Sequence, residues 1–364
     1  MSTLESKTGV QIPHARQGEA PSRPGFAPER LERLVRVAVA ECRLDLSGRC
    51  VVTEAATGAY VVTPVLAALA GARRVIAVTR STRYGTTVEV QAATLRLAAR
   101  LGVADVIEVV EELTPEHLAA ADVVTNSGHV RPIDERMAAR LTPGAVVPLM
   151  YESWELAARS ADVDTAALRA HGIAFAGTNE RHPHVDVFSY LGMMAVWQLA
   201  QAGVAVHRSR LALVCDNEFA PYVGLGLTRA GAHVLLRSHI LDLPDTDQFD
   251  AILVAQTPTS GDVIDAIAAR RIARCWPGAP VVQFWGDVDR AALAEAGVGV
   301  WPPQAPPRGH MGVLPSDIGP EAIVRLQCGG LKVAEVLLTP ADERTVNDLE
   351  HIDPHPDCEV LDVD

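Results

Sequence analysis

Acidic and imidazole side chains gather in one short stretch near the middle of the chain, where residues 179–186 read NERHPHVD. Glu180, His182, His184 and Asp186 could exchange protons with a substrate, because a carboxylate beside an imidazole fixes its tautomer and raises its basicity. Alternate residues of an extended segment point the same way, so His182, His184 and Asp186 could instead ligate a metal ion. However, the sequence identifies no distant ligand, and a polar hinge with a helix cap is a third interpretation. We take the four residues as candidate catalytic groups and assign no metal.

A second group of candidates follows the first two Val-rich runs. Thr57 and Gly58 come after CVVTE and open a predicted helix, so their turn could contact a phosphate or could be a plain strand–helix turn. Arg80, Ser81 and Arg83 come after the run RRVIAVT. A 2′-phosphate needs a planar cation and hydroxyl groups here, where NAD enzymes keep an acid. These residues therefore predict NADP as the cofactor, with NAD as the other choice, and a solvated surface edge as the alternative.

The remaining candidates are polar residues expected at the mouth of the same crevice. Asn126 and Ser127 follow the run ADVVT, where the ribose of a nicotinamide would lie in such a sheet. Arg131 could hold a carboxylate through its planar fork. A structural loop is the alternative for each of them. The predicted substrate-binding residues are His129, Arg131, Glu152, Asn179, Asp216, Asn217 and His310.

Short Val- and Ile-rich runs alternate with Ala- and Leu-rich helical stretches along most of the chain. This alternation predicts parallel sheets with right-handed crossovers. Residues 162–177 (DVDTAALRAHGIAFAG) match residues 287–302 (DVDRAALAEAGVGVWP) without gaps, and TPGAVVPL at 142–149 pairs with WPGAPVVQ at 276–283. We therefore expect an α/β protein built by tandem duplication, with two Rossmann-like domains, parallel sheets and an interdomain cleft.

The composition along the chain suggests where these domains begin and end. Residues 1–27 lack periodicity and predict a mobile arm. We expect the first domain, with the candidate nucleotide site, over 28–178 and a connecting segment and helix over 179–203. The second domain is predicted over 204–339, and an acidic tail over 340–364.

Three stretches carry a resemblance to a known family: GTNERHPHVDVFSYLGMMAVWQLAQAG (177–203), PGAPVVQFWGDVDRAALAEAGV (277–298) and VLPSDIGPEAIVRLQCGGLKVAEVLL (313–338). They resemble the entry helix, the strand–turn–helix and the closing helix of the cofactor domain in the D-isomer-specific 2-hydroxyacid dehydrogenases. Adenosylhomocysteinase has a related layout. The resemblance implies a two-domain, Rossmann-type dehydrogenase.

The chain departs from that family at three functional positions. CDNEFAPYVG at 215–224 replaces the glycine motif that lets a backbone approach a pyrophosphate. Trp285 precedes the glycine where the family has its substrate-binding arginine, and Asp317 stands where the family has its catalytic histidine. The first half is therefore the better candidate for the nucleotide site.

Composition limits the choice of partners. The chain has 364 residues, 48% of them hydrophobic, and a formal net charge of −13, which repels nucleic acid. No apolar run is long enough to cross a membrane, and six scattered cysteines predict reduced thiols in a cytoplasmic protein. We expect a small-molecule substrate, no nucleic-acid or membrane partner, and a homodimer.

These features together favour an NAD(P)-dependent oxidoreductase that acts on a small polar or carboxylate-bearing metabolite in the interdomain cleft. Two alternatives stay open. One is a non-redox lyase, hydrolase or transferase that uses Glu180, His182 and His184. The other is a ligand-binding homologue of the dehydrogenases without catalytic activity.

Overall fold

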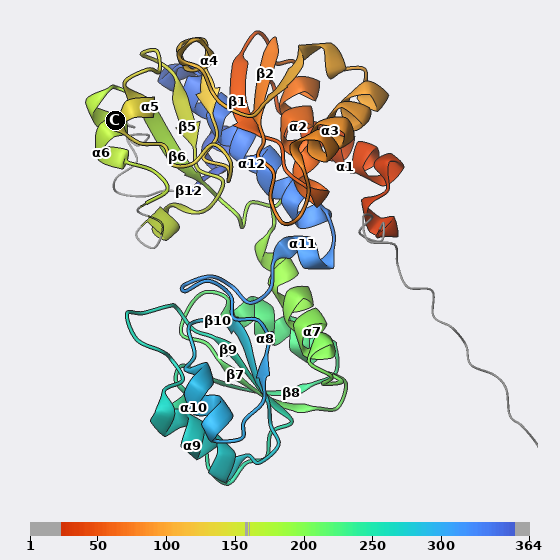
Figure 1. Ribbon diagram of the computed structural model, residues 1–364, viewed down its shortest axis with the longest axis vertical. Coiled ribbons are helices and arrows are strands. Elements are labelled where there is room, and N and C mark those ends of the chain that lie inside the picture. The colour runs from red at the N-terminus through yellow and green to blue at the C-terminus, as the bar shows by residue number, and fades with distance from the viewer. Residues whose placement is uncertain (1–22, 157–158, 160, 354–364) are drawn as a thin grey trace, which may run out of the picture.

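The computed structural model describes residues 23–156, 159 and 161–353, which form two lobes joined at a narrow waist (Figure 1). The upper lobe holds a seven-stranded sheet in the order β12-β6-β5-β4-β1-β2-β3. Only β12 is antiparallel to its neighbour. The strands are β1 Cys50–Glu54, β2 Arg74–Val78, β3 Ile107–Val110, β4 Val123–Val124, β5 Val146–Pro148, β6 Ala174–Thr178 and β12 Ile352–Asp353.

Helices cover both faces of this first sheet (Figure 1). In α1, Leu31, Val35 and Ala38 form the buried face, as the helical spacing of these residues predicts. The helix α3 begins with a capping box between Thr86 and Glu89 and ends at Gly102, which is left-handed. The helices are α1 Pro28–Glu41, α2 Val62–Leu69, α3 Thr87–Leu101, α4 Pro115–Ala119, α5 Glu135–Ala138, α6 Thr165–Ala170, α12 Glu321–Leu338 and α13 Val346–Leu349.

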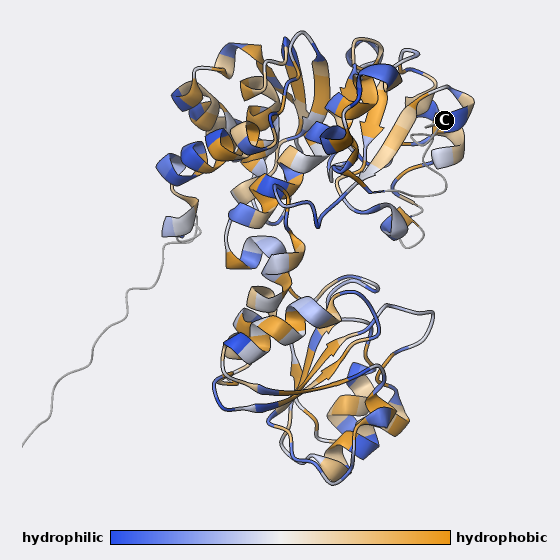
Figure 2. Ribbon diagram, turned by 180° about the vertical axis from the view of Figure 1, so that it is seen from behind, coloured by the Kyte–Doolittle hydropathy of each residue, from blue (hydrophilic) through white to orange (hydrophobic). Residues whose placement is uncertain are grey.

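The lower lobe holds a five-stranded parallel sheet in the order β11-β10-β9-β7-β8. Its central strands are buried along almost their whole length and are mostly apolar, with Gln283 as a buried polar exception, and its helices turn their polar sides outward (Figure 2). The strands are β7 Arg210–Val214, β8 His233–Arg237, β9 Ala251–Ala255, β10 Val281–Trp285 and β11 Val300–Trp301. The helices are α7 Leu191–Gln201, α8 Ala220–Arg229, α9 Ala266–Cys275 and α10 Arg290–Glu295, and α11 Pro315–Ile318 leads back to the first lobe.

The architecture confirms two Rossmann-like domains with mostly parallel sheets. In the first sheet, the order from β3 to β6 is 3-2-1-4-5-6, the order of a dinucleotide-binding sheet. In the second sheet, the order of the five strands from β8 is 2-1-3-4-5, as in flavodoxin-like sheets.

The domain boundaries differ from those that the sequence predicts. The helix α12 packs on β5, β6 and α2 of the first domain, and its side chains belong to that domain's core. Part of the expected tail also belongs there, because β12 pairs with β6 and Ile352 is buried in the same core. The second domain is thus inserted between β6 and α12. Residues 1–22 and 354–364 of the expected arm and tail lie outside the described residues.

Candidate functional site

The strands β1 and β4 lie side by side at the centre of the first sheet, where the strand order changes direction. Thr53 Oγ1 at the end of β1 lies 2.8 Å from Thr125 Oγ1, which follows β4, and Thr125 also bonds to Ser127. All three side chains are buried. Such a switch point opens a crevice at the carboxyl ends of the strands, and ligands of open α/β sheets bind there.

Unpartnered polar atoms surround this switch point. Thr79 Oγ1 and Glu152 Oε1 are buried without a hydrogen-bond partner among the described residues, while buried Asn126 Nδ2 and the Tyr151 hydroxyl have at most each other. They follow β2, β4 and β5, so all four lie at the carboxyl edge of the sheet. A buried polar group without a partner costs about 1–3 kcal/mol, which a polar ligand can offset.

The turn between β1 and α2 has a different construction from a glycine-rich phosphate loop. Gly58 is left-handed, with φ +66°, and exposed; a Cβ built on it would come no closer than 4.0 Å to the Phe26 ring, so the backbone is accessible there. Glu54 is buried at the end of β1 and accepts a hydrogen bond from the His129 N–H at 3.0 Å. Thr57, next to Gly58, is half-buried. The carboxylate of Glu54 thus connects this turn to the segment after β4.

The residues predicted to hold a 2′-phosphate lie at the end of β2 and are exposed. The Thr87 N–H donates to Ser81 Oγ at 3.1 Å, and the Arg83 guanidinium lies 4.7 Å from the centre of the Tyr84 ring. Arg80 has no ion pair within the described part of the chain.

Carboxyl groups cluster where β5 and β6 end. Glu152 is 1% exposed, and its Oε2 accepts hydrogen bonds from Trp154 Nε1 at 2.7 Å and from Arg181 at 3.1 Å. Burial raises the pKa of Glu152. Burial, together with the charges of Glu155 and Glu152, raises the pKa of Glu180 well above its usual value. A raised pKa keeps a carboxyl protonated to a higher pH than an ordinary glutamate, as a general acid requires.

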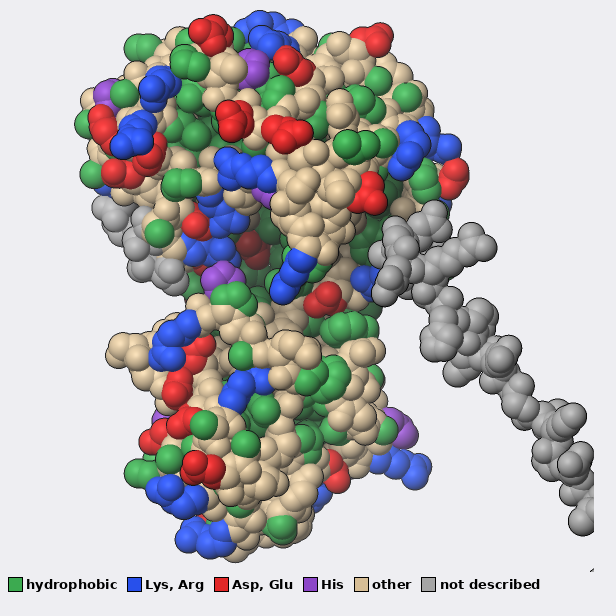
Figure 3. Space-filling model, in the orientation of Figure 1, with side chains coloured by type: hydrophobic (Ala, Val, Ile, Leu, Met, Phe, Trp, Pro, Cys, Tyr) green, Lys and Arg blue, Asp and Glu red, His purple; other side chains and the backbone are tan. Residues whose placement is uncertain are grey.

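The second domain faces this carboxyl cluster across the waist. Arg181 also forms an ion pair with Glu218, which lies between β7 and α8. The rings of Trp154 and Trp285 meet edge to face with centroids 5.8 Å apart, and Trp285 stacks on Phe219. The space-filling view shows acidic and basic side chains around the hollow between the lobes (Figure 3).

The switch point of the second sheet is largely occupied by its own side chains. Asn217 Nδ2 donates to the Ala255 carbonyl at 2.9 Å, and Asp216 accepts from the Thr257 N–H at 2.8 Å. Of the buried polar atoms that follow these strands, Gln256 Oε1 has no partner among the described residues. The first sheet therefore offers more unpaired polar atoms to a ligand than the second.

The other predicted substrate-binding residues lie in several places. Arg131 forms an ion pair with Asp162. Asn179 donates to the Glu350 carbonyl at 2.8 Å, and exposed His310 lies beside the carbonyl of Arg308.

The side chains of segment 179–186 lie in two separate groups. Glu180 belongs to the carboxyl cluster, whereas the rings of His182 and His184 lie against His351 of the C-terminal segment. Asp186 accepts a hydrogen bond from Ser189 at 2.6 Å. The structure therefore separates the imidazoles from the acids that the sequence places beside them.

Tyr151, Trp154, Arg181 and His351 were absent from the sequence-based candidates. The stretch YESWE after a predicted strand contained a usable signal for the first two, because polar and aromatic residues at a strand end line the crevice. Nothing in the sequence around His351 indicates that it contacts a distant loop.

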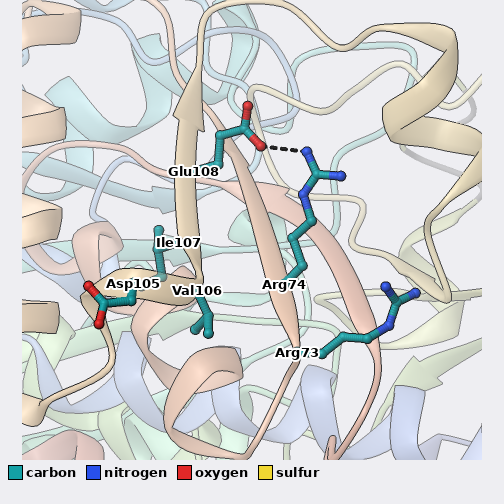
Figure 4. A pocket seen from close by; sticks show the side chains of 6 residues that line it. All are labelled: Arg73, Arg74, Asp105, Val106, Ile107 and Glu108. Carbon is teal, nitrogen blue, oxygen red and sulfur yellow. Dashed lines mark hydrogen bonds and ion pairs between the residues drawn. The ribbon is translucent and has the colours of Figure 1, made fainter.

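A separate hollow of about 370 Å³ lies at the opposite end of the first sheet (Figure 4). Arg73, Arg74 and Glu108 line it, and Arg74 pairs with Glu108 at 2.6 Å. It adjoins the amino ends of β2 and β3, away from the switch-point crevice.

Comparison with known proteins shows the fold. The dipicolinate synthase structure from Bacillus halodurans has a TM-score of 0.50 and 12% identity, over 81% of this chain and all of that chain. The dipicolinate synthase structure from Bacillus subtilis has a TM-score of 0.50 and 11% identity, over 81% of this chain and 96% of that chain. No family model and no curated protein matches the sequence. This likeness confirms the expected two-domain, Rossmann-type fold, and at these identities it shows the fold alone.

The described residues include no helix with the length and apolar character needed to cross a bilayer.

Proposed function

We propose that the protein is an NAD(P)-dependent oxidoreductase that acts on a small polar, carboxylate-bearing metabolite in the cleft between its domains. The observation that carries this proposal is the set of four buried, under-satisfied polar atoms at the carboxyl edge of the first sheet, on Thr79, Asn126, Tyr151 and Glu152. They surround a β1/β4 switch point in a sheet of dinucleotide-binding order. The expected homodimer and cytoplasmic location stay predictions.

The first domain is the proposed holder of the cofactor. Thr57 and Gly58 would lie against its phosphates, because the left-handed Gly58 leaves the backbone open to close approach. Arg80, with Ser81 and Arg83 beside it, would hold a 2′-phosphate. Asn126 and Ser127 would contact the nicotinamide end, with Asn126 Nδ2 as a donor. A bound nicotinamide supplies or accepts a hydride.

The carboxyl cluster provides the proposed proton chemistry. Glu180, whose pKa is raised by desolvation and by its acidic neighbours, is the proposed proton donor to a substrate carbonyl. Arg181 and Arg131 are the proposed partners of a substrate carboxylate, since guanidinium groups bind it through two parallel hydrogen bonds. Trp154 and Trp285 would cover the reacting groups and exclude water. His182 and His184 contact a different group of side chains, so this scheme leaves them without a role.

Cofactor binding tests the proposal, and the repeated architecture provides a matched control. Arg80 follows β2 in the first domain, and Arg237 ends the corresponding strand β8 in the second. We expect NADPH to bind the wild-type protein and Arg80→Ala to weaken NADPH binding about tenfold, because a charge-assisted phosphate contact is lost. NADH binding should change little, and Arg237→Ala should leave both affinities unchanged. Isothermal titration calorimetry measures all of these affinities.

Each contrary result has a distinct meaning. Absence of binding by NADPH and NADH would overturn the oxidoreductase and favour the non-redox or purely ligand-binding alternatives. A loss of affinity in Arg237→Ala but not in Arg80→Ala would move the cofactor to the second domain.

A further inference from the structure

Three imidazoles meet inside the first domain, beside the point where the chain leaves for the second. One ring nitrogen from each of His182, His184 and His351 lies within 4.8 Å of the other two. The rings of His182 and His351 stack with centroids 3.7 Å apart. His351 is fully buried, His182 is 4% exposed, and His184 is half-buried.

Hydrogen bonds determine which nitrogens carry lone pairs. His351 Nδ1 lies 2.9 Å from the Asn347 carbonyl, which can only accept, so Nδ1 carries the proton and Nε2 keeps its lone pair. That Nε2 is buried without a partner among the described residues, and so is His184 Nδ1. His182 Nδ1 accepts a hydrogen bond from the His184 N–H at 3.2 Å, so it also has a lone pair. A carbonyl that holds the distal nitrogen of an imidazole is the usual outer partner of a metal-binding histidine.

Two thiols adjoin the imidazoles. Cys42 caps α1 and Cys328 lies within α12; both are buried and neither forms a disulfide. Cys328 and His351 both lower the pKa of the Cys42 thiol, which places that thiol near the His351 ring without a hydrogen bond of standard geometry to its Nε2. Nitrogen and sulfur ligands without carboxylates suit Zn²⁺ and exclude the oxygen-preferring Mg²⁺ and Ca²⁺.

We propose that His182, His184 and His351 bind a zinc ion, with the thiol of Cys42, which lies outside their 4.8 Å group, as the candidate fourth ligand. A tetrahedral site with zinc–nitrogen bonds of about 2.1 Å brings its ligand nitrogens within about 3.5 Å of one another, so side-chain rotations complete the site. The ion replaces the missing partners of His351 Nε2 and His184 Nδ1. The ion would also bind the lone pair of His182 Nδ1, which would then lose its 3.2 Å hydrogen bond from the His184 N–H. Asp186, which the sequence offers as a ligand, is bonded to Ser189 and is not part of this site.

The site would connect three segments that are distant in sequence. Cys42 comes from the end of α1, His182 and His184 from the loop after β6, and His351 from the residue before β12. Arg325 of α12 also holds the loop, because it donates to the His184 carbonyl at 3.0 Å and pairs with Glu41 of α1. Bound zinc would therefore fix the C-terminal segment and the start of the interdomain connection to one domain.

Metal binding to the intact chain is the test. Protein stripped with a chelator under reducing conditions should take up one zinc ion per chain, measured by mass spectrometry and by competition with a chromophoric chelator. Cobalt(II) in the same site should show the visible bands of tetrahedral coordination and a sulfur-to-cobalt charge-transfer band. These measurements use the wild-type protein, so they do not depend on the folding of a variant.

Variants then assign the ligands. His351→Ala should weaken zinc binding at least tenfold, while His171→Ala, which alters a histidine paired with Glu135 on the same domain, should leave it unchanged. Asp186→Ala should also bind zinc normally, and Cys42→Ser should lose the charge-transfer band.

Wild-type protein that binds no zinc at micromolar concentration, or equal losses in His351→Ala and His171→Ala, would overturn the site. Zinc binding without a charge-transfer band would overturn Cys42 as a ligand. None of these outcomes depends on NADPH binding.

Discussion

At the scale of single residues, burial outweighs the favourable contacts of the Glu152 carboxyl. Arg181 and the Trp154 N–H favour its charged form, whereas burial and the charge of Asp353 oppose it, and Glu180 lies in the same cluster. Burial is the largest of these effects, so the folded protein holds the Glu152 proton more tightly than the unfolded chain. Ionising this group therefore reduces stability.

We predict that Glu152→Gln becomes more stable than the wild-type protein as the pH rises. The folded pKa of Glu152 lies above its ordinary value of 4.5, so below that value the wild-type carboxyl is neutral in both states and carries no penalty. As the pH rises through the raised pKa, the wild-type protein loses stability while the glutamine, which keeps an oxygen for Trp154, does not. Thermal unfolding at about pH 5 and about pH 8 measures the difference.

Glu108→Gln is the control with the opposite sign. Arg74 lowers the pKa of exposed Glu108, so the wild-type pair adds stability that is already present above the ordinary carboxyl pKa of 4.5. Glu108→Gln should therefore lie slightly below the wild-type protein by about the same amount at both pH values. If the offset of Glu152→Gln is also the same at both pH values, the buried charge of Glu152 is not what penalises folding.

At the scale of elements, local patterns predict the strands and helices but not their partners. The run RCVVTE forms β1 at Cys50–Glu54, and VTPVLAAL forms α2 at Val62–Leu69, because apolar periodicity and strand-forming residues act locally. The apolar residues of α12 predict a buried helix, but they do not indicate whether it packs on the first or the second sheet. His351 could not be predicted as a partner of His182, because it reaches that loop only through the pairing of β12 with β6.

The helices α7 and α8 approach each other closely because both have glycine at their point of contact. Gly226 of α8 lies against Gly192 of α7, and a Cβ on Gly226 would come within 2.4 Å of the Gly192 Cα. Gly224, two residues before Gly226 in the same helix, has more room, because a Cβ there would meet only the Leu213 side chain, at 3.8 Å.

We therefore expect opposite effects from the same substitution at these two positions. Gly226→Ala should destabilise the protein by about 1–3 kcal/mol, because the helices must move apart. Gly224→Ala should stabilise it by about 0.5–1 kcal/mol, since alanine favours the helix and meets no clash. Urea unfolding followed by circular dichroism gives both values. A loss of stability in both variants would show that general sensitivity of α8, rather than contact with Gly192, determines the result.

At the scale of the whole molecule, the inserted second domain has its own hydrophobic cores. The first-domain core takes in α1, the seven-stranded sheet and α12, and it shares none of the described residues with the two cores of the second domain. The chain crosses the waist twice, between β6 and α7 and between α11 and α12 (Figure 1). Contacts between side chains across the cleft include the Trp154–Trp285 ring pair and the Arg181–Glu218 ion pair. Such a molecule can unfold one domain at a time.

We predict that substitutions in different domains shift different unfolding transitions. Lys332 in α12 is 4% exposed and pairs with Glu335 at 2.5 Å and with Asp348 at 3.2 Å. Lys332→Met leaves these carboxylates without their cation and should cost about 1–3 kcal/mol, all of it in the first domain. Gly226→Ala should lower the transition of the second domain alone. Differential scanning calorimetry separates the transitions, and hydrogen exchange assigns each to a domain. If the protein instead shows a single transition that both variants lower equally, the interdomain contacts couple the two cores into one cooperative unit. The cleft could then not open without loosening the sheets that line it.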